Sequence, residues 1–254
     1  MKKLLTIILL LPMLAFGMKT IELTDQNSVT FSEAFTDQYV AVKQLELFKL
    51  ALTSPEQDLY LVMYTPGGSV SAGSLFIDTV SALDKKVHTI TIFSASMGYH
   101  TVQGLGKRYI LPSGTLMSHR AFVSGLSGSF PGELITRINM LMESTLILDK
   151  VAAKRVGMSV KNYKKAIHDE LWATGQDAVD QGHADEVIKA TCGAGLDGTY
   201  EKVVFSIFGP ITITFSKCPL IIGPVNISTS NKAAYQFLME TEFSNIRNRV
   251  RASI

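Results

Sequence analysis

The feature that most constrains the fold is an apolar run at 59–64, Leu-Tyr-Leu-Val-Met-Tyr, which Thr65-Pro66-Gly67-Gly68 interrupts at once. A nearly continuous apolar run of this length is typical of a strand that is covered on both faces, as in parallel sheets. Residues 70–83 then have the pattern of a helix, and a second strand at 87–93 precedes a short helix at 97–105. Strands that alternate with helices predict an α/β fold with a mostly parallel sheet.

Apolar spacing predicts two longer helices. The first covers 41–52, and its expected buried face consists of Ala41, Leu45, Phe48 and Leu52. The second covers 131–156 and ends at Gly157, and its expected buried face consists of Leu134, Ile138, Leu141, Thr145, Leu148 and Ala152. At about 25 residues, the second helix exceeds the usual length in globular domains, so we expect it to project and to pack against another subunit.

Shorter elements complete this part of the chain. Residues 20–23 form an extended piece, and 108–111 and 115–117 are expected to be two strands that lead to His119. Ser159 is expected to cap the N-terminus of a short helix. The sequence Thr174-Gly175-Gln176-Asp177 resembles a capping box that opens another one.

The composition changes after Ile188. Residues 202–208 and 211–215 are expected to be two strands about Gly209-Pro210, followed by a connection rich in Pro, Gly and Ser and by a final helix. The sequence therefore predicts three parts, namely a leader at 1–17, a main domain at 18–189 and a small β-rich extension with a terminal helix at 190–254.

The leader has the layout of a secretory signal peptide. Lys2-Lys3 form a charged start, residues 4–16 are almost all apolar, and Ala15-Phe16-Gly17 offers small residues just before Met18. The apolar run is short for a transmembrane helix, and an uncleaved membrane anchor is the alternative. We therefore expect an exported protein, periplasmic or secreted, which stays membrane-anchored if the leader is not cleaved.

The only two cysteines are Cys192 and Cys218. An even pair in an exported protein usually forms a disulfide, and two buried free thiols are the alternative. The chain has no CxxC motif and no cluster of His and Cys, so we expect no metal site and no cofactor.

Composition and charge exclude several classes of protein. A chain with 46% hydrophobic and 18% charged residues is not a disordered one. A formal net charge of +2, without a clustered basic face, gives no reason to expect a nucleic-acid partner. The sequence contains no GxxxxGK[ST] phosphate loop, so we expect no ATPase activity of its own.

The serine turn Ser94-Ala95-Ser96-Met97-Gly98 lies where a strand passes into a helix. Unpaired N–H groups and the positive end of the helix dipole favour negative charge at such a place. Together with the upstream glycine pair and the downstream His119, the turn fits nucleophilic catalysis. His100 follows Ser96 by four residues on the same helix face and is a competing base, with a buried or subunit-facing role as the alternative.

Four motifs in the same order resemble the ClpP-type serine peptidases of the ClpP/crotonase superfamily. They are the strand and glycine loop at 59–73, the serine turn at 94–98, the approach to the histidine at 106–119, and the closing helix and turn at 177–185. The resemblance covers about 28–188 and excludes the leader and the C-terminal extension. It implies a spiral of ββα units with a long projecting handle helix at 131–156.

The resemblance also implies residue roles. Ser96 corresponds to the nucleophile and His119 to the general base. The backbone N–H groups of Gly68 and Met97 correspond to the oxyanion hole.

The third member of the catalytic triad is less directly defined. A gapless match places Glu170 where the family has aspartate, and Asp169 is the alternative acid; in a third reading neither carboxylate serves. The next residue, usually an arginine that bridges two stacked rings, is Leu171 here. The stacking of two rings is therefore in question.

The resemblance implies a serine endopeptidase that cleaves peptides or unfolded proteins as a homo-oligomeric ring. The family usually works with a cytoplasmic ATP-driven unfoldase, and an exported chain would lose that ATPase partner. We therefore expect ATP-independent activity. Two alternatives stay open: an inactive ClpP-like scaffold, and an acyl-CoA hydratase or isomerase of the same superfamily.

Overall fold

The structure, a computed structural model, describes residues 17–206, 209–229 and 236. Its main sheet has the strand order β2-β3-β4-β5-β6, with β7 paired to β5. These strands are β2 (Ser28–Phe31), β3 (Asp58–Thr65), β4 (Lys86–Ala95), β5 (Arg108–Ser118), β6 (Leu171–Thr174) and β7 (Glu186–Val187). The helices are α1 (Asp37–Thr53), α2 (Val70–Ser81), α3 (Met97–Gly104), α4 (Gly132–Arg155), α5 (Val160–Ala166) and α6 (Gly175–Asp180).

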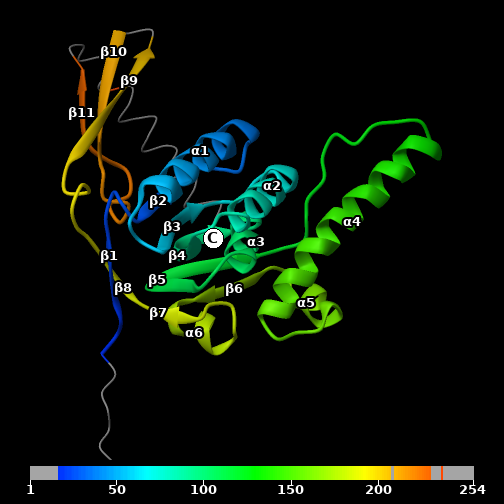
Figure 1. The fold of residues 1–254 in the computed structure, drawn as a ribbon. Coiled ribbons are helices and arrows are strands. Elements are labelled where there is room, and N and C mark those ends of the chain that lie inside the picture. The colour runs from blue at the N-terminus through cyan, green and yellow to red at the C-terminus, as the bar shows by residue number, and fades with distance from the viewer. Residues whose placement is uncertain (1–16, 207–208, 230–235, 237–254) are drawn as a thin grey trace, which may run out of the picture.

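The predicted α/β fold is confirmed. Strands β2 to β5 pair in parallel, and β6 joins β5 in antiparallel orientation. Alternate residues of β3 enter two different cores, which explains its continuous apolar run. Leu61 and Met63 pack in the larger core beneath the helices, whereas Val62 packs in a second core with Ile21 and Ile188. Figure 1 shows α1, α2 and α3 together on one side of the sheet.

The parallel strands carry the chemistry-bearing loops to one edge of the sheet. Thr65 of β3 pairs with Ser94 of β4, and Ala95 of β4 pairs with Met117 of β5. The glycine loop, the serine turn and His119 follow these paired positions directly. The carboxyl ends of parallel strands thereby bring together segments that lie far apart in the sequence.

The long helix α4 projects from the body of the protein, as the sequence predicts. Figure 1 shows its N-terminal end far from the sheet and its C-terminal half against the other helices. Accordingly, its buried residues are Leu148, Asp149, Ala152 and Ala153. The expected inward face is correct in this half only, because Ile138 near the N-terminal end is 40% exposed.

The predicted buried face of α1 is wrong. Leu45 and Leu52 are 54% and 86% exposed, whereas Val40, Leu47 and Leu50 are buried. The helix carries apolar residues on more than one side, so spacing identifies a helix without identifying the side that meets the sheet.

Two smaller expectations need correction, and a third is confirmed. The two strands expected at 108–111 and 115–117 form one strand, β5, and a register irregularity opposite Thr91–Phe93 absorbs the intervening residues. Thr174 does not cap α6 with its side chain; its hydroxyl instead lies 3.3 Å from that of Thr115 across the sheet. Ser159 does cap α5, accepting a hydrogen bond from Asn162 N–H.

The segment after β7 contains more strands than expected. A parallel pair joins β1 (Thr20–Leu23) to β8 (Lys189–Cys192). The expected hairpin is present as β9 (Thr199–Ser206) and β10 (Gly209–Ser216), and β11 (Pro224–Thr229) adds a third antiparallel strand where the sequence suggested a mere connection. A Cys192–Cys218 disulfide, with Cα atoms 5.8 Å apart, ties the end of β8 to the turn after β10.

Two expectations fall outside the described residues. Residues 1–16 of the leader and nearly all of the expected terminal helix at 230–254 are not described. In the part of the chain that is described, no helix is long and apolar enough to span a membrane. The division at 189/190 stays a prediction.

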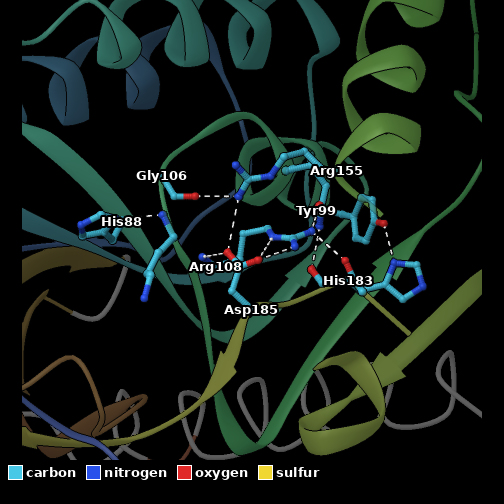
Figure 2. A network of polar contacts seen from close by, with 10 residues as sticks. His88, Tyr99, Gly106, Arg108, Arg155, His183 and Asp185 are labelled. Atoms are coloured by element: carbon cyan, nitrogen blue, oxygen red, sulfur yellow. Dashed lines mark hydrogen bonds and ion pairs between the residues drawn. The ribbon is translucent and has the colours of Figure 1, made fainter. Parts of the chain in front are cut away.

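A polar network joins β5 to the turn after α6 and to the end of α4 (Figure 2). Arg108 is buried, and its guanidinium donates to the Asp185 carboxylate, to Gly182 O at 2.8 Å and to Gln103 Oε1 at 2.6 Å. Arg155 of α4 donates to Gly106 O at 2.6 Å and lies 3.5 Å from Asp185 Oδ2. This network fixes the base of α4 against the sheet.

Replacing Asp185 with Asn should test this anchor. Burial raises the pKa of Asp185, but the hydrogen bonds and charge of Arg108 outweigh it, so the net pKa lies below the ordinary 3.8. The carboxylate therefore stabilises the fold at neutral pH, and this contribution is lost as the pH falls below that value. We expect Asp185→Asn to cost about 2 kcal/mol of unfolding free energy at pH 7, measured by urea denaturation.

The matched control is Asp84→Asn, because Asp84 is exposed and lies in a turn outside the network. It should leave the stability unchanged. An Asp185→Asn protein as stable as the wild type at pH 7 would contradict the anchoring role.

Candidate active site

Ser96 occupies a strained turn between β4 and α3. Its backbone has φ 55° and ψ −118°, a conformation that glycine adopts readily and that other residues rarely do. The turn is held by Ser96 N–H donating to Met117 O at 2.9 Å and by His100 N–H donating to Ser96 O at 3.2 Å. Strain of this kind persists only where the surrounding structure enforces it, and it is concentrated at functional sites.

The glycine loop after β3 packs directly on this turn. A Cβ atom on Gly67 would lie 2.6 Å from Ser96 Cβ and from Ala95 O, so a side chain at this position has no room. Gly68 is equally confined, because its Cβ would lie 2.6 Å from the backbone of Phe35. Hydrogen bonds from Phe35 N–H to Gly67 O and from Ser69 N–H to Phe35 O, both 2.8 Å, hold the loop in place.

Two backbone N–H groups near Ser96 are free to bind an anion. Neither Gly68 N–H nor Met97 N–H donates a hydrogen bond to another described residue. Met97 is the first residue of α3, so its N–H has no acceptor within the helix and lies at the positive end of the helix dipole. Backbone N–H groups in such positions are suited to stabilise a developing oxyanion.

His119 follows β5 directly and faces the same cavity as Ser96. This cavity has a volume of about 600 Å³, and Ser96, Met97, His100, His119, Leu148 and Asp149 are among the residues that line it. No hydrogen bond joins His119 to Ser96 in this structure. The fold therefore places the serine and the histidine in one cavity, but the two side chains are not hydrogen-bonded to each other.

Neither candidate acid forms a hydrogen bond or an ion pair with His119. Glu170, at φ 72°, accepts a hydrogen bond from Trp172 Nε1 at 3.0 Å. Asp169 lies 2.6 Å from Nδ1 of its neighbour His168 and is almost fully exposed. The structure thus brings together the predicted nucleophile, base and oxyanion donors, whereas both carboxylates are turned toward other partners.

His100 is a neutral neighbour of His119. Its Nδ1 is buried and has no hydrogen-bond partner among the described residues. Burial, and then electrostatic repulsion from nearby His119, lower the pKa of His100 to about 4. The imidazole is therefore uncharged at neutral pH, and it is a much weaker base than an ordinary histidine.

Sequence reasoning missed the charged residues of the cavity, namely Asp149, Arg120, Lys164 and Lys165, of which Asp149 is buried and the other three are exposed. Asp149 lies on the inward side of α4, next to Leu148, and is only 8% exposed. Burial raises the pKa of its carboxyl group, and the ammonium of Lys164 opposes this shift. Its signal in the sequence was a charge next to the apolar face of the long helix, four residues after Thr145.

The described part of the chain offers no group of three or more His, Cys, Asp or Glu side chains that could hold a metal ion.

The strain at Ser96 has a measurable consequence. Glycine adopts the observed backbone angles without penalty, so Ser96→Gly should be more stable than Ser96→Ala by about 1 kcal/mol, with both variants lacking the hydroxyl. Urea denaturation of the two variants checks this. Equal stability, or a less stable glycine variant, would show that the turn is not strained.

Comparison with known proteins identifies a family to which this chain is similar. The family described as Clp protease matches residues 18–191, a wider span than the motifs alone suggested. The ATP-dependent Clp protease proteolytic subunit of Streptococcus sanguinis strain SK36 is 31% identical over 136 residues, which cover 52% of this chain and 69% of the relative.

Two other streptococcal relatives carry the same description. That of Streptococcus suis strain 98HAH33 is 30% identical over 149 residues, or 58% of this chain and 76% of the relative. That of Streptococcus pyogenes serotype M1 is 29% identical over 136 residues, or 52% and 69%. Because the family match spans more than half of the chain, this protein belongs to the Clp protease family of ClpP-type serine peptidases.

Proposed function

We propose that this protein is a serine endopeptidase in which Ser96 is the nucleophile and His119 the general base. The observation that carries the proposal is the strained Ser96 turn, which shares one cavity with His119 and lies against the glycine loop. The wider family function supports it.

In the proposed reaction, Ser96 Oγ attacks the carbonyl carbon of the scissile peptide bond while His119 accepts the hydroxyl proton. The negative charge on the carbonyl oxygen is stabilised by the N–H groups of Gly68 and Met97. His119 then donates the proton to the leaving amine as the C–N bond breaks, which leaves an acyl-enzyme. Water, deprotonated by His119, hydrolyses the ester and regenerates the Ser96 hydroxyl.

We propose Glu170 as the carboxylate that orients His119, with Asp169 as the alternative. Glu170 follows Ile167 and His168, which both line the cavity. Its side chain would have to leave the indole of Trp172 to reach His119. A carboxylate in that position holds the imidazole in the required tautomer and stabilises its charged form.

The assignment is tested by labelling purified residues 18–254 with a fluorophosphonate, which reacts with activated serines. We expect an adduct on Ser96, found by peptide mass spectrometry, and none in Ser96→Ala. His119→Ala should slow both labelling and peptide cleavage by about 10³-fold or more, because the serine loses its base.

The acid is tested in the same assay. Glu170→Gln should lower the rate far more than Asp169→Asn does. A folded, oligomeric protein that neither labels nor cleaves would contradict the peptidase and favour the scaffold alternative. Cleavage that survives Ser96→Ala would contradict the site.

The protein is further proposed to be exported and to work without ATP. The leader-like residues 1–17 and the Cys192–Cys218 disulfide support export, because disulfides persist mainly in oxidising compartments. ATP and an unfoldase would be lacking there, so substrates would be peptides or loosely folded proteins. Peptide hydrolysis should therefore proceed at the same rate with and without added ATP.

Assembly through α4 is proposed as well. Exposed apolar side chains run along this helix, namely Ile135, Ile138, Met140, Met142, Ile147 and Val151. An apolar surface of this extent on a projecting helix favours a partner, and a second copy of the chain is the partner that the family resemblance implies.

Assembly is tested by light scattering on two matched variants of α4. Met142 is 63% exposed, and Met142→Glu would place a charge in the proposed interface, so we expect a shift to smaller species. Glu143→Gln, on the neighbouring exposed residue, should keep the wild-type mass. A wild-type protein that is monomeric at all concentrations would contradict assembly through this helix.

A further inference from the structure

The cavity beside Ser96 is lined by a largely buried carboxylate, that of Asp149. Asp149 is 8% exposed. Among the described residues, its ionic partner is Lys164 on α5, whose Nζ lies 3.7 Å from Asp149 Oδ2, a long contact for an ion pair. Lys164 itself is half exposed, with 51% of its side chain accessible.

Such a group is costly to keep without a closer partner. A buried carboxylate loses its hydration and is stabilised only by charges and donors that approach it directly. Burial raises the pKa of Asp149 even with Lys164 nearby. The cavity therefore offers to whatever enters it a carboxylate whose ionic partner, Lys164, is distant and half exposed.

The shape and lining of the cavity indicate what could enter. Its walls include the apolar side chains of Val70, Met97, Leu148 and Ile167. A volume of about 600 Å³ is ample for one long side chain. An aliphatic stem would pack along these walls while a cationic head reached the carboxylate, which is how Lys and Arg side chains bury themselves.

The position of the cavity relates it to the scissile bond. Ser96 would be bonded to the carbonyl carbon of the residue that precedes the cleaved bond, and the side chain of that residue starts one atom away. The cavity that Ser96 and Met97 border is therefore the one that this side chain reaches first.

We propose that Asp149 makes this cavity selective for arginine or lysine at the residue preceding the cleaved bond. The proposal rests on the proposed function, since it assigns substrate specificity to the same site. Arginine is the better fit, because its guanidinium can donate two parallel hydrogen bonds to one carboxylate.

Cationic side chains of the protein itself also line this cavity and can compete with the substrate for Asp149. Arg120, Lys164 and Lys165 are exposed and border its mouth. Of these, Lys164 is the one paired with Asp149, so the substrate cation has to replace it. Removing this competitor by Lys164→Gln should strengthen the preference for arginine, whereas a purely structural Asp149–Lys164 pair would predict no such gain.

The first experiment measures cleavage of paired fluorogenic peptides that carry arginine or its neutral isostere citrulline before the cleaved bond. For the wild type we expect kcat/KM to favour arginine by about ten-fold or more, the range of a hydrogen bond to a charged group. Asp149→Asn should abolish the preference, and Glu143→Gln, an exposed change on the same helix, should keep it. Fluorophosphonate labelling of Ser96 in Asp149→Asn controls for an intact site.

The second experiment separates this proposal from the peptidase itself. Ser96→Ala cannot form an acyl-enzyme, so fluorescence anisotropy of the labelled arginine and citrulline peptides on this variant measures binding alone. We expect tighter binding of the arginine peptide, lost in Ser96→Ala/Asp149→Asn. Equal binding of both peptides, or a preference that survives the loss of the carboxylate, would overturn the proposal even if the enzyme is active.

Discussion

The parallel pairing of β3, β4 and β5 is the constraint on which the rest of the structure depends. It aligns the ends of three strands, so that the glycine loop, the serine turn and His119 leave the sheet at one edge. The hydrogen bond from Ser96 N–H to Met117 O then fixes the turn to the neighbouring strand. Because the pairing of β4 with β3 and β5 and this hydrogen bond hold the turn in place, Ser96 can keep backbone angles that an isolated chain would avoid.

Helix α4 forms part of the wall of the cavity beside Ser96. Helix α4 projects from the body, yet its C-terminal end is held by the Arg108–Asp185–Arg155 network. This attachment brings Leu148 and Asp149 against α3, where they close the cavity beside Ser96. The same helix therefore lines the cavity beside Ser96 at one end and, along the rest of its length, exposes the apolar surface that we propose for assembly.

Much of this could be predicted from the sequence, for physical reasons. Strand and helix periods identify β3, β4, α2 and α3, and parallel pairing then implies that Gly68, Ser96 and His119 meet. The buried side of α1 could not be predicted, because Leu45 and Leu47 are equally apolar and only the packing distinguishes them. The presence of Asp149 in the cavity could not be predicted either, because it depends on how α4 packs against the rest of the protein. The direction of the Glu170 side chain depends on a backbone at φ 72°, which no sequence period reports.

The most direct test of the account is a crystal structure of the protein after reaction with a peptidyl phosphonate, which mimics the tetrahedral intermediate. The account requires a bond from phosphorus to Ser96 Oγ, with the phosphonyl oxygen about 2.7–3.1 Å from both Gly68 N and Met97 N. A reagent attached to another serine, or an adduct on Ser96 whose oxygen turns away from these two N–H groups, would contradict the proposed catalytic centre.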